Sequence, residues 1–241
     1  MRRAVFGAMA ATLALSACSV SKAEDGGPTT SRTFPVGGFT KIEVAGPFDV
    51  DVTTGGQPSV AAQGPQKLLE KMVVEVDGNT LRIHPEKRSG WFGSGFSWSG
   101  GKARVAVSAP MIEGAAIAGS GDVRVNRVSG PRFAGSIAGS GNLRIAEVRV
   151  EDLRLEIAGS GEASAAGQAA RARYEIAGSG DIRAGQVASQ QVSADIAGSG
   201  NIEANATDTA KVGIAGSGDV RVTGGAKCSI SKAGSGNVQC S

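Results

Sequence analysis

Ile137-Ala-Gly-Ser-Gly-Asn-Leu-Arg-Ile145 is the stretch that decides the fold, because close copies of it recur through the second half of the chain. The tetrapeptide Ala-Gly-Ser-Gly occurs seven times, at spacings of 20, 20, 19, 20, 18 and 18 residues. The copies begin at Ala118, Ala138, Ala158, Ala177, Ala197, Ala215 and Ala233. A period this regular predicts a repeat architecture in which each copy is one structural unit.

The residues around each tetrapeptide alternate between apolar and polar, as in Val123-Arg124-Val125. This period of two indicates β-strands, with Val123 and Val125 inward and Arg124 outward. Helical repeats need about 33 residues or more, which is longer than this unit. We therefore predict an all-β solenoid with coils of 18–20 residues, each holding two or three short strands and stacked on the next at the spacing of a β-sheet.

The composition fits a slender coil. The chain of 241 residues holds 37 glycines, two of them in every copy, while aromatic residues make up only 4%. Glycine allows a tight corner and a close approach of two backbones, and the Asp, Asn or Glu that follows each Gly-Ser-Gly is typical of turns. A narrow core also leaves little room for aromatic rings.

The N-terminus reads as an export signal. Arg2 and Arg3 precede a short apolar run, and Leu15-Ser-Ala-Cys18 resembles the lipobox of bacterial lipoproteins, in which the cysteine is lipidated. The alternative is an ordinary secretory signal with a chance cysteine. We expect a signal peptide over residues 1–17, a lipidated flexible tether over 18–35 with Cys18 as the lipidation site, and placement in the bacterial cell envelope. Ser19 after the cysteine favours the outer membrane.

Residues 36–241 are expected to form a single solenoid domain. Within it, residues 36–110 have larger side chains and irregular spacing, which predicts irregular N-terminal coils that cap the stack, and residues 111–241 hold the repeats. A short helical turn is expected over 65–71 and a turn between two strands over 77–79.

Three stretches together carry a resemblance to a known family: Phe39-Thr-Lys-Ile-Glu-Val-Ala-Gly-Pro-Phe-Asp-Val50, Asn79-Thr-Leu-Arg-Ile83 and the iterated Gly-Ser-Gly-Asp/Asn-aliphatic motif. The chain resembles the bacterial putative auto-transporter adhesin, head GIN domain family, over about residues 36–240. The resemblance implies a fold like a right-handed parallel β-helix and a protein that is exported or lipidated. It implies no catalytic residues.

The repeated polar residues suggest scaffold rather than chemistry. The Asp/Asn/Glu column is similar to that of Ca²⁺-binding β-rolls, but those have a nine-residue period, so a hydrogen-bonded ladder is favoured over a metal site. The recurrent serines have no histidine or lysine partner nearby, and His84 is the single histidine. We therefore expect no catalytic residues, no metal, no cofactor and no enzymatic activity.

Three features remain as candidate sites. The segment 85–102 carries the aromatic residues Trp91, Phe92, Phe96 and Trp98, and it reads as a lid over the apolar end, as a disordered loop or as a binding loop. Cys228 and Cys240 are a candidate disulfide across the last coils, with two free thiols as the alternative. Arg124, Arg144, Arg183 and Arg221 form a possible row for acidic glycans, or pair with carboxylates and stay solvated.

The net charge argues against one class of partner, nucleic acids. Without Arg2 and Arg3 the net charge is +1, which gives little support to nucleic-acid binding. The favoured function is a non-catalytic, membrane-anchored solenoid that presents a rigid surface to a surface glycan or an envelope protein. A periplasmic structural or sensing component is the alternative. A carbohydrate-active enzyme is third, because the sequence lacks the expected cluster of Asp, Lys and Arg. The oligomeric state stays open.

Overall fold

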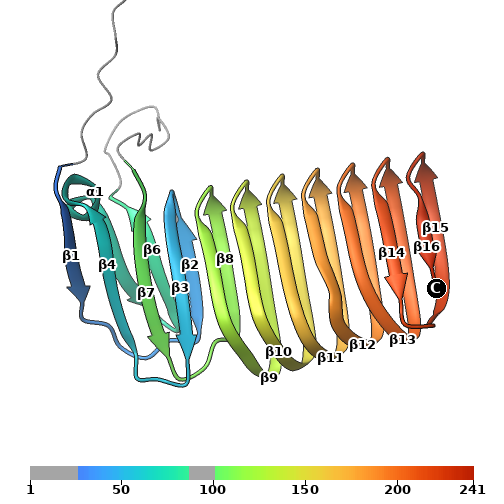
Figure 1. Cartoon of the computed structure of the whole chain (residues 1–241), viewed down its shortest axis with the longest axis horizontal. Helices are drawn as coiled ribbons and strands as arrows, with labels where there is room; N and C mark the ends of the chain where they lie inside the picture. Colours follow the sequence, from blue (N-terminus) through green and yellow to red (C-terminus); the bar gives the residue numbers. More distant parts are fainter. Residues whose placement is uncertain (1–26, 87–100) are drawn as a thin grey trace, which may run out of the picture.

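The structure is a computed structural model, and it describes residues 27–86 and 101–241. Strands make up 76% of it and helix 2%, and the chain winds into a β-solenoid of about six turns. Figure 1 shows the coils stacked side by side along one axis, with β1 and α1 at one end and β15 and β16 at the other. The predicted all-β solenoid is therefore confirmed.

The elements fall into two groups along the chain. The N-terminal group is β1 (Thr29–Phe34), β2 (Lys41–Ala45), β3 (Phe48–Thr54), β4 (Ser59–Pro65), α1 (Gln66–Glu70), β5 (Met72–Asp77), β6 (Thr80–Pro85), β7 (Ala103–Ala109) and β8 (Gly114–Gly119). The repeats form β9 (Asp122–Gly139), β10 (Asn142–Gly159), β11 (Glu162–Gly178), β12 (Asp181–Gly198), β13 (Asn201–Gly216), β14 (Asp219–Thr223), β15 (Lys227–Gly234) and β16 (Val238–Cys240).

The strands build two walls that enclose the core. Wall 1 has the order β1, β4, β7, β3, the first halves of β9 to β13, β14 and β16. Wall 2 has the order β5, β6, β2, β8, the second halves of β9 to β13, and β15. Pairing is parallel everywhere except β1 with β4, β4 with β7, and β5 with β6, all in the N-terminal part.

Five repeats, β9 to β13, each form one long bent strand instead of the two or three short strands that we expected, while the next repeat is divided into the short strands β14 and β15. β9 and β10 both run for 18 residues from one Gly-Ser-Gly turn to the next. The chain passes from wall 1 to wall 2 at a bend, where the pairing slips between Ile145 and Val148 and between Ala184 and Ala188. Pairing resumes at Val148 and at Ala188, so the bend interrupts the strand less than a turn would. The slips also absorb the variation in coil length.

The opposite edge of every coil, which we call the Gly-Ser-Gly edge, stays in strict register. In Figure 1 the arrowheads of β8 to β13 all lie along this upper edge. Here Ser179 donates its backbone N–H to the carbonyl of Gly159, at 2.8 Å. Gly178 has a φ of +133°, and a Cβ built on it would lie 2.3 Å from the Gly159 oxygen. Only glycine fits this close stacking of one coil on the next.

The core follows the predicted columns. Val123 and Val125 are buried, and so are their counterparts Leu143 and Ile145 one coil later. The isoleucines before each Ala-Gly-Ser-Gly stack directly on one another and are buried in all six copies that have one: Ile117, Ile137, Ile157, Ile176, Ile196 and Ile214. The alternation of apolar and polar residues therefore predicted correctly which side chains point into the core on both walls.

The N-terminal end contains the features that the sequence placed there. The expected helical turn is α1, which buries Leu68 and Leu69. The expected turn at 77–79 connects β5 to β6 in an antiparallel pair, with Gly78 at a φ of +59°. Strand β1, antiparallel to β4, forms the outer edge of wall 1 at this end (Figure 1). Strand β5, antiparallel to β6, forms the outer edge of wall 2.

Residues 29–34, which we assigned to the flexible tether, form strand β1 instead. β1 pairs with β4 along its whole length, and it buries Phe34, which is 7% exposed. The Arg32 guanidinium lies 4.6 Å from the centre of the Phe34 ring and donates a hydrogen bond to the Leu69 carbonyl at 3.2 Å. β1 is an edge strand with polar outward residues, so its composition resembles that of a linker.

The C-terminal coil closes with a disulfide between Cys228 in β15 and Cys240 in β16. Cys228 stacks on Ala210, and Cys240 stacks on Val222, so both cysteines continue inward columns. The bond therefore joins wall 2 to wall 1 across the end of the core. Beside it, Ile230 is 51% exposed, and Lys232 takes the place of the column isoleucine and donates from Nζ to the Gly236 carbonyl at 2.9 Å.

The core contains one large polar side chain, Tyr174, in wall 2. It is fully buried among small residues such as Ala172 and Ala194. Within the described residues its hydroxyl makes no hydrogen bond of ordinary geometry, although the Ser189 side chain lies close enough to oppose the rise in its pKa. Burial raises the pKa of the Tyr174 phenol well above its ordinary value of 10.0. A buried hydroxyl without a partner lowers stability, because it loses its hydrogen bonds to water on folding.

Candidate binding face

The outer face of wall 2 carries four rows of side chains that run along the solenoid axis. Strict register between the coils produces them, because each outward position stacks on its counterpart in the next coil. From the Gly-Ser-Gly edge toward the bend, the first is an alanine row: Ala138, Ala158, Ala177, Ala197, Ala215 and Ala233. Next to it lies an acidic row, which contains Ser136, Glu156, Glu175, Asp195, Gly213 and Ser231, and then a basic row, which contains Ala134, Arg154, Arg173, Ser193, Lys211 and Ser229. The fourth, nearest the bend, is a mixed row: Arg132, Asp152, Arg171, Gln191, Thr209 and Lys227.

Two grooves lie between these rows. The first, which we call the alanine groove, has a volume of about 820 Å³, follows the alanine row, and is bordered by Glu156, Glu175 and Asp195. The second, the basic groove, has a volume of about 680 Å³ and lies over the basic and mixed rows. Short side chains make both grooves, because an alanine or serine next to an arginine leaves a trough beside it.

Ion pairs fix the long side chains that separate the grooves. Arg171 holds Asp152 in the neighbouring coil through two hydrogen bonds, of 2.6 Å to Oδ1 and 2.8 Å to Oδ2. Arg173 pairs with Glu175 in its own strand. The hydrogen bond from Arg171 lowers the pKa of Asp152, and the bond to Glu175 raises the pKa of Arg173. Asp152, Arg171 and Arg173 are solvent-exposed and Glu175 is half-buried, so these pairs organise the surface more than they stabilise the fold.

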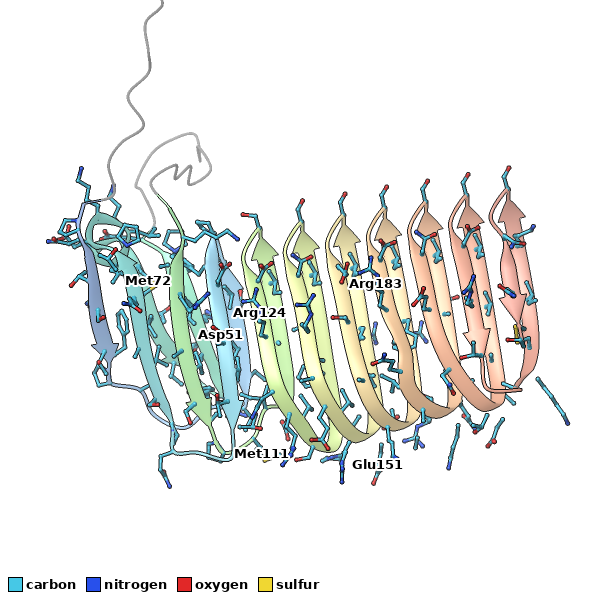
Figure 2. All side chains as sticks on the ribbon, in the orientation of Figure 1. Asp51, Met72, Met111, Arg124, Glu151 and Arg183 are labelled. Carbon is cyan, nitrogen blue, oxygen red and sulfur yellow. A yellow bond between two sulfur atoms is a disulfide. The ribbon has the colours of Figure 1, made fainter. Side chains whose placement is uncertain are left out.

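The arginine row foreseen from the sequence lies on the opposite face, on wall 1. Figure 2 labels Asp51, Arg124 and Arg183, which follow one another in this order along the axis. Arg124 pairs with Asp51 at 3.5 Å, and Arg183 pairs with Glu162 at 2.7 Å. Arg144 and Arg221 have no ion pair within the described part of the chain. Ser164 and Glu203 interrupt the row, so it does not form a continuous cationic surface.

The Asp/Asn column on wall 1 forms a hydrogen-bonded ladder. Asn142 donates from Nδ2 to Asp122 at 2.7 Å, and Asn201 donates in the same way to Asp181 at 2.9 Å. The backbone N–H of Asn237 binds Asp219 at 2.8 Å. Among residues 27–86 and 101–241, no group of three or more His, Cys, Asp or Glu side chains is arranged to hold a metal ion.

Some candidate residues fall outside the structure that is described. Cys18 precedes it, and Trp91, Phe92, Phe96 and Trp98 lie in the undescribed segment 87–100. His84 is described: its Nε2 lies 3.3 Å from Glu75 on the neighbouring strand β5. The helical part of the described chain contains nothing long and apolar enough to cross a membrane.

The comparisons with known proteins agree with this architecture. The model of the family described as putative auto-transporter adhesin, head GIN domain matches residues 38–226. The chain belongs to this family. Its fold is similar to that of a putative adhesin from Bacteroides fragilis, with a TM-score of 0.78, 24% identity, and coverage of 88% of this chain and 97% of the other.

Two further solved structures share the fold. A putative lipid binding protein from Parabacteroides distasonis has a TM-score of 0.72 at 23% identity, covering 90% of this chain and 98% of the other. A putative adhesin from Parabacteroides merdae has a TM-score of 0.64 at 20% identity, with the same coverages. No curated protein matches the chain. The names of the family and of these structures describe adhesins or a lipid-binding protein and no enzyme.

The rows on wall 2 were missed by the sequence reasoning. Arg132, Arg171 and Lys211 each occur in a different copy, and no short motif contains them together. Superimposing the copies and reading every outward position as a column would have found the rows. The drift in spacing at the bend obscures this alignment, because residues 152 and 171 are 19 apart while residues 132 and 152 are 20 apart.

Proposed function

We propose that this protein is an exported lipoprotein of the bacterial cell envelope, anchored through Cys18, whose solenoid binds another macromolecule without catalysing a reaction. The observation that carries the proposal is the outer face of wall 2, where two grooves run side by side along several coils. Membership of a family described as adhesins supports a binding role.

The physical basis is the rigidity of this face. Each outward residue sits on a strand that is hydrogen-bonded to both neighbouring coils, so the rows keep their spacing without a ligand. A surface that is already organised loses little conformational entropy on binding. A long, regular face of this kind suits an extended partner, such as a surface glycan or an elongated segment of an envelope protein.

Filling the alanine groove tests the proposed face. Ala177→Arg and Ala197→Arg place long side chains on exposed positions of wall 2, and Ala146→Arg is the matched change on an exposed position at the bend, outside both grooves. We expect beads coated with the protein to attach to isolated envelopes or cell surfaces, and the two wall-2 variants to lose attachment while Ala146→Arg keeps it. Equal loss in all three variants would place the binding elsewhere.

The anchor is tested separately. We expect radiolabelled palmitate to label the wild type and not Cys18→Ala, and the variant to leave the membrane fraction. Protease treatment of intact cells then distinguishes a surface protein, which is cleaved, from a periplasmic structural or sensing component, which is protected. A Cys18→Ala protein that stays membrane-bound would contradict the lipoprotein assignment.

A further inference from the structure

The basic groove concentrates positive charge on one stretch of wall 2. Its lining includes five cationic side chains, Arg132, Arg154, Arg171, Arg173 and Lys211, against a single carboxylate, that of Asp152. The protein as a whole is close to neutral, so this local excess does not follow from its composition. Buried Phe133, Leu153 and Val192 support the floor.

The cations at the two ends of the groove are not held in ion pairs, although Asp152 in the next coil still acts electrostatically on Arg132. Arg171 is used by Asp152, while Arg154 and Arg173 pair with the acidic row beside the groove. Within the described residues, Arg132 and Lys211 have no carboxylate at ion-pair distance. Arg132 lies in the first coil of the groove and Lys211 in the fifth. The mixed row gives this count, because it runs in register from Arg132 through Asp152, Arg171 and Gln191 to Thr209, and Thr209 and Lys211 belong to the same strand.

The separation of these two cations sets the size of the ligand. Four coil spacings of about 4.8 Å place the ends of the groove about 19 Å apart. An inorganic anion or a single sugar cannot reach both ends. An extended polymer that carries several acidic groups can contact Arg132, the central arginines and Lys211 at the same time.

The other polar groups of the groove fit a hydroxylated ligand. The fourth coil contributes Gln191 and Ser193 in place of charged residues, and the fifth contributes Thr209. Amide and hydroxyl groups both donate and accept hydrogen bonds, as sugar hydroxyls do, and guanidinium groups match carboxylates in a fork. The backbone groups along the walls are already paired between coils, which leaves the ligand to be held by side chains.

We propose that the basic groove binds a linear acidic polysaccharide, laid along the solenoid axis with carboxylate groups on Arg132, the central arginines and Lys211. This inference rests on the proposed binding function of wall 2 and names its ligand class. The test uses the full-length protein purified in detergent, with polygalacturonate as the probe. Neutral dextran, monomeric galacturonic acid and polyglutamate serve as comparison ligands.

We expect the wild type to bind polygalacturonate, with affinity falling as salt is added, and to bind the three comparison ligands much more weakly. Arg132→Gln combined with Lys211→Gln should weaken binding by about tenfold per residue, since each charge-assisted contact is worth roughly 1.5 kcal/mol. Both substitutions remove a cation that forms no ion pair with the described residues, so the fold should be preserved, which circular dichroism checks. Arg144→Gln combined with Arg221→Gln removes the same charge from wall 1 and should keep full affinity.

Three results would overturn the inference: no binding of polygalacturonate by the wild type, equal loss in the wall-1 control, or equal affinity for polyglutamate. Failure here is distinguishable from failure of the proposed function. If Ala177→Arg abolishes attachment to envelopes while polygalacturonate does not bind, the binding face stands and its ligand is of another class.

Discussion

The Gly-Ser-Gly edge makes a sharp prediction about single methyl groups. Replacing Gly178 by alanine forces a side chain onto a residue with a φ of +133°, and its Cβ would lie 2.3 Å from the carbonyl oxygen of Gly159. The backbone strain costs about 1–3 kcal/mol, and relieving the overlap by shifting the coils costs about 1–3 kcal/mol more. We therefore expect Gly178→Ala to reduce the free energy of unfolding by about 2–6 kcal/mol.

Gly185 supplies the matched control in the next coil. It lies outside the positive-φ glycines, and the nearest heavy atom to a built Cβ is that of Glu203 at 3.8 Å, an ordinary contact. Gly185→Ala should change the free energy of unfolding by no more than about 0.5 kcal/mol. Urea unfolding followed by circular dichroism measures both variants, and with a slope of about 2 kcal/mol per molar the Gly178→Ala midpoint should fall by about 1–3 M. If the two variants unfold at the same urea concentration, the close stacking of the edge is wrong.

Three further predictions concern the core and the last coil. Tyr174→Phe removes a buried hydroxyl that makes no hydrogen bond of ordinary geometry within the described residues, so thermal unfolding should show a gain of about 1–3 kcal/mol; a loss would mean that the hydroxyl is hydrogen-bonded, with Ser189 as the nearby candidate. Because burial raises the pKa of this phenol, the folded state favours the neutral form, and the free energy of unfolding should be at its full value below pH 10 and fall as the pH rises above 10. Tyr174 is the only tyrosine, so the phenolate absorbance should appear together with unfolding. Phenolate absorbance in the still-folded protein would refute this prediction. Replacing Cys228 and Cys240 by serine removes a disulfide that links residues 12 apart in the sequence, which should lower the free energy of unfolding by about 2–3 kcal/mol. Amide hydrogen exchange should accelerate in β15 and β16 but not in β10, and uniform acceleration would contradict a local role.

The sequence was sufficient for the repeat and its inward face, because alternation and strict spacing report directly on burial. Val123, Leu143 and Val220 are buried as the pattern predicts. The bend was less predictable. Whether a corner is a turn or a bulged continuation of the strand depends on hydrogen bonds to the neighbouring coils, which no single copy reveals.

The features that the sequence did not predict also depend on contacts between different segments of the chain. β1 was assigned to a flexible tether because an edge strand presents polar residues, and only its pairing with β4 buries Phe34. The grooves of wall 2 depend on neighbours from different copies, so a pattern read along the chain does not reveal them. The arginine row on wall 1 was visible because Arg124 and Arg183 follow the repeated motif directly.

The bend gives the protein a way to change without losing its surface. Coils of 18, 19 and 20 residues coexist here, and the difference is taken up where the pairing slips, between Ala184 and Ala188 for example. Insertions at that side would leave the Gly-Ser-Gly edge and the order of the wall-2 rows intact. Whole copies can likewise be duplicated or removed in evolution, which would lengthen or shorten the grooves in steps of one coil. The reach of the binding face would then be set by copy number, while the residue in each row would set its chemistry.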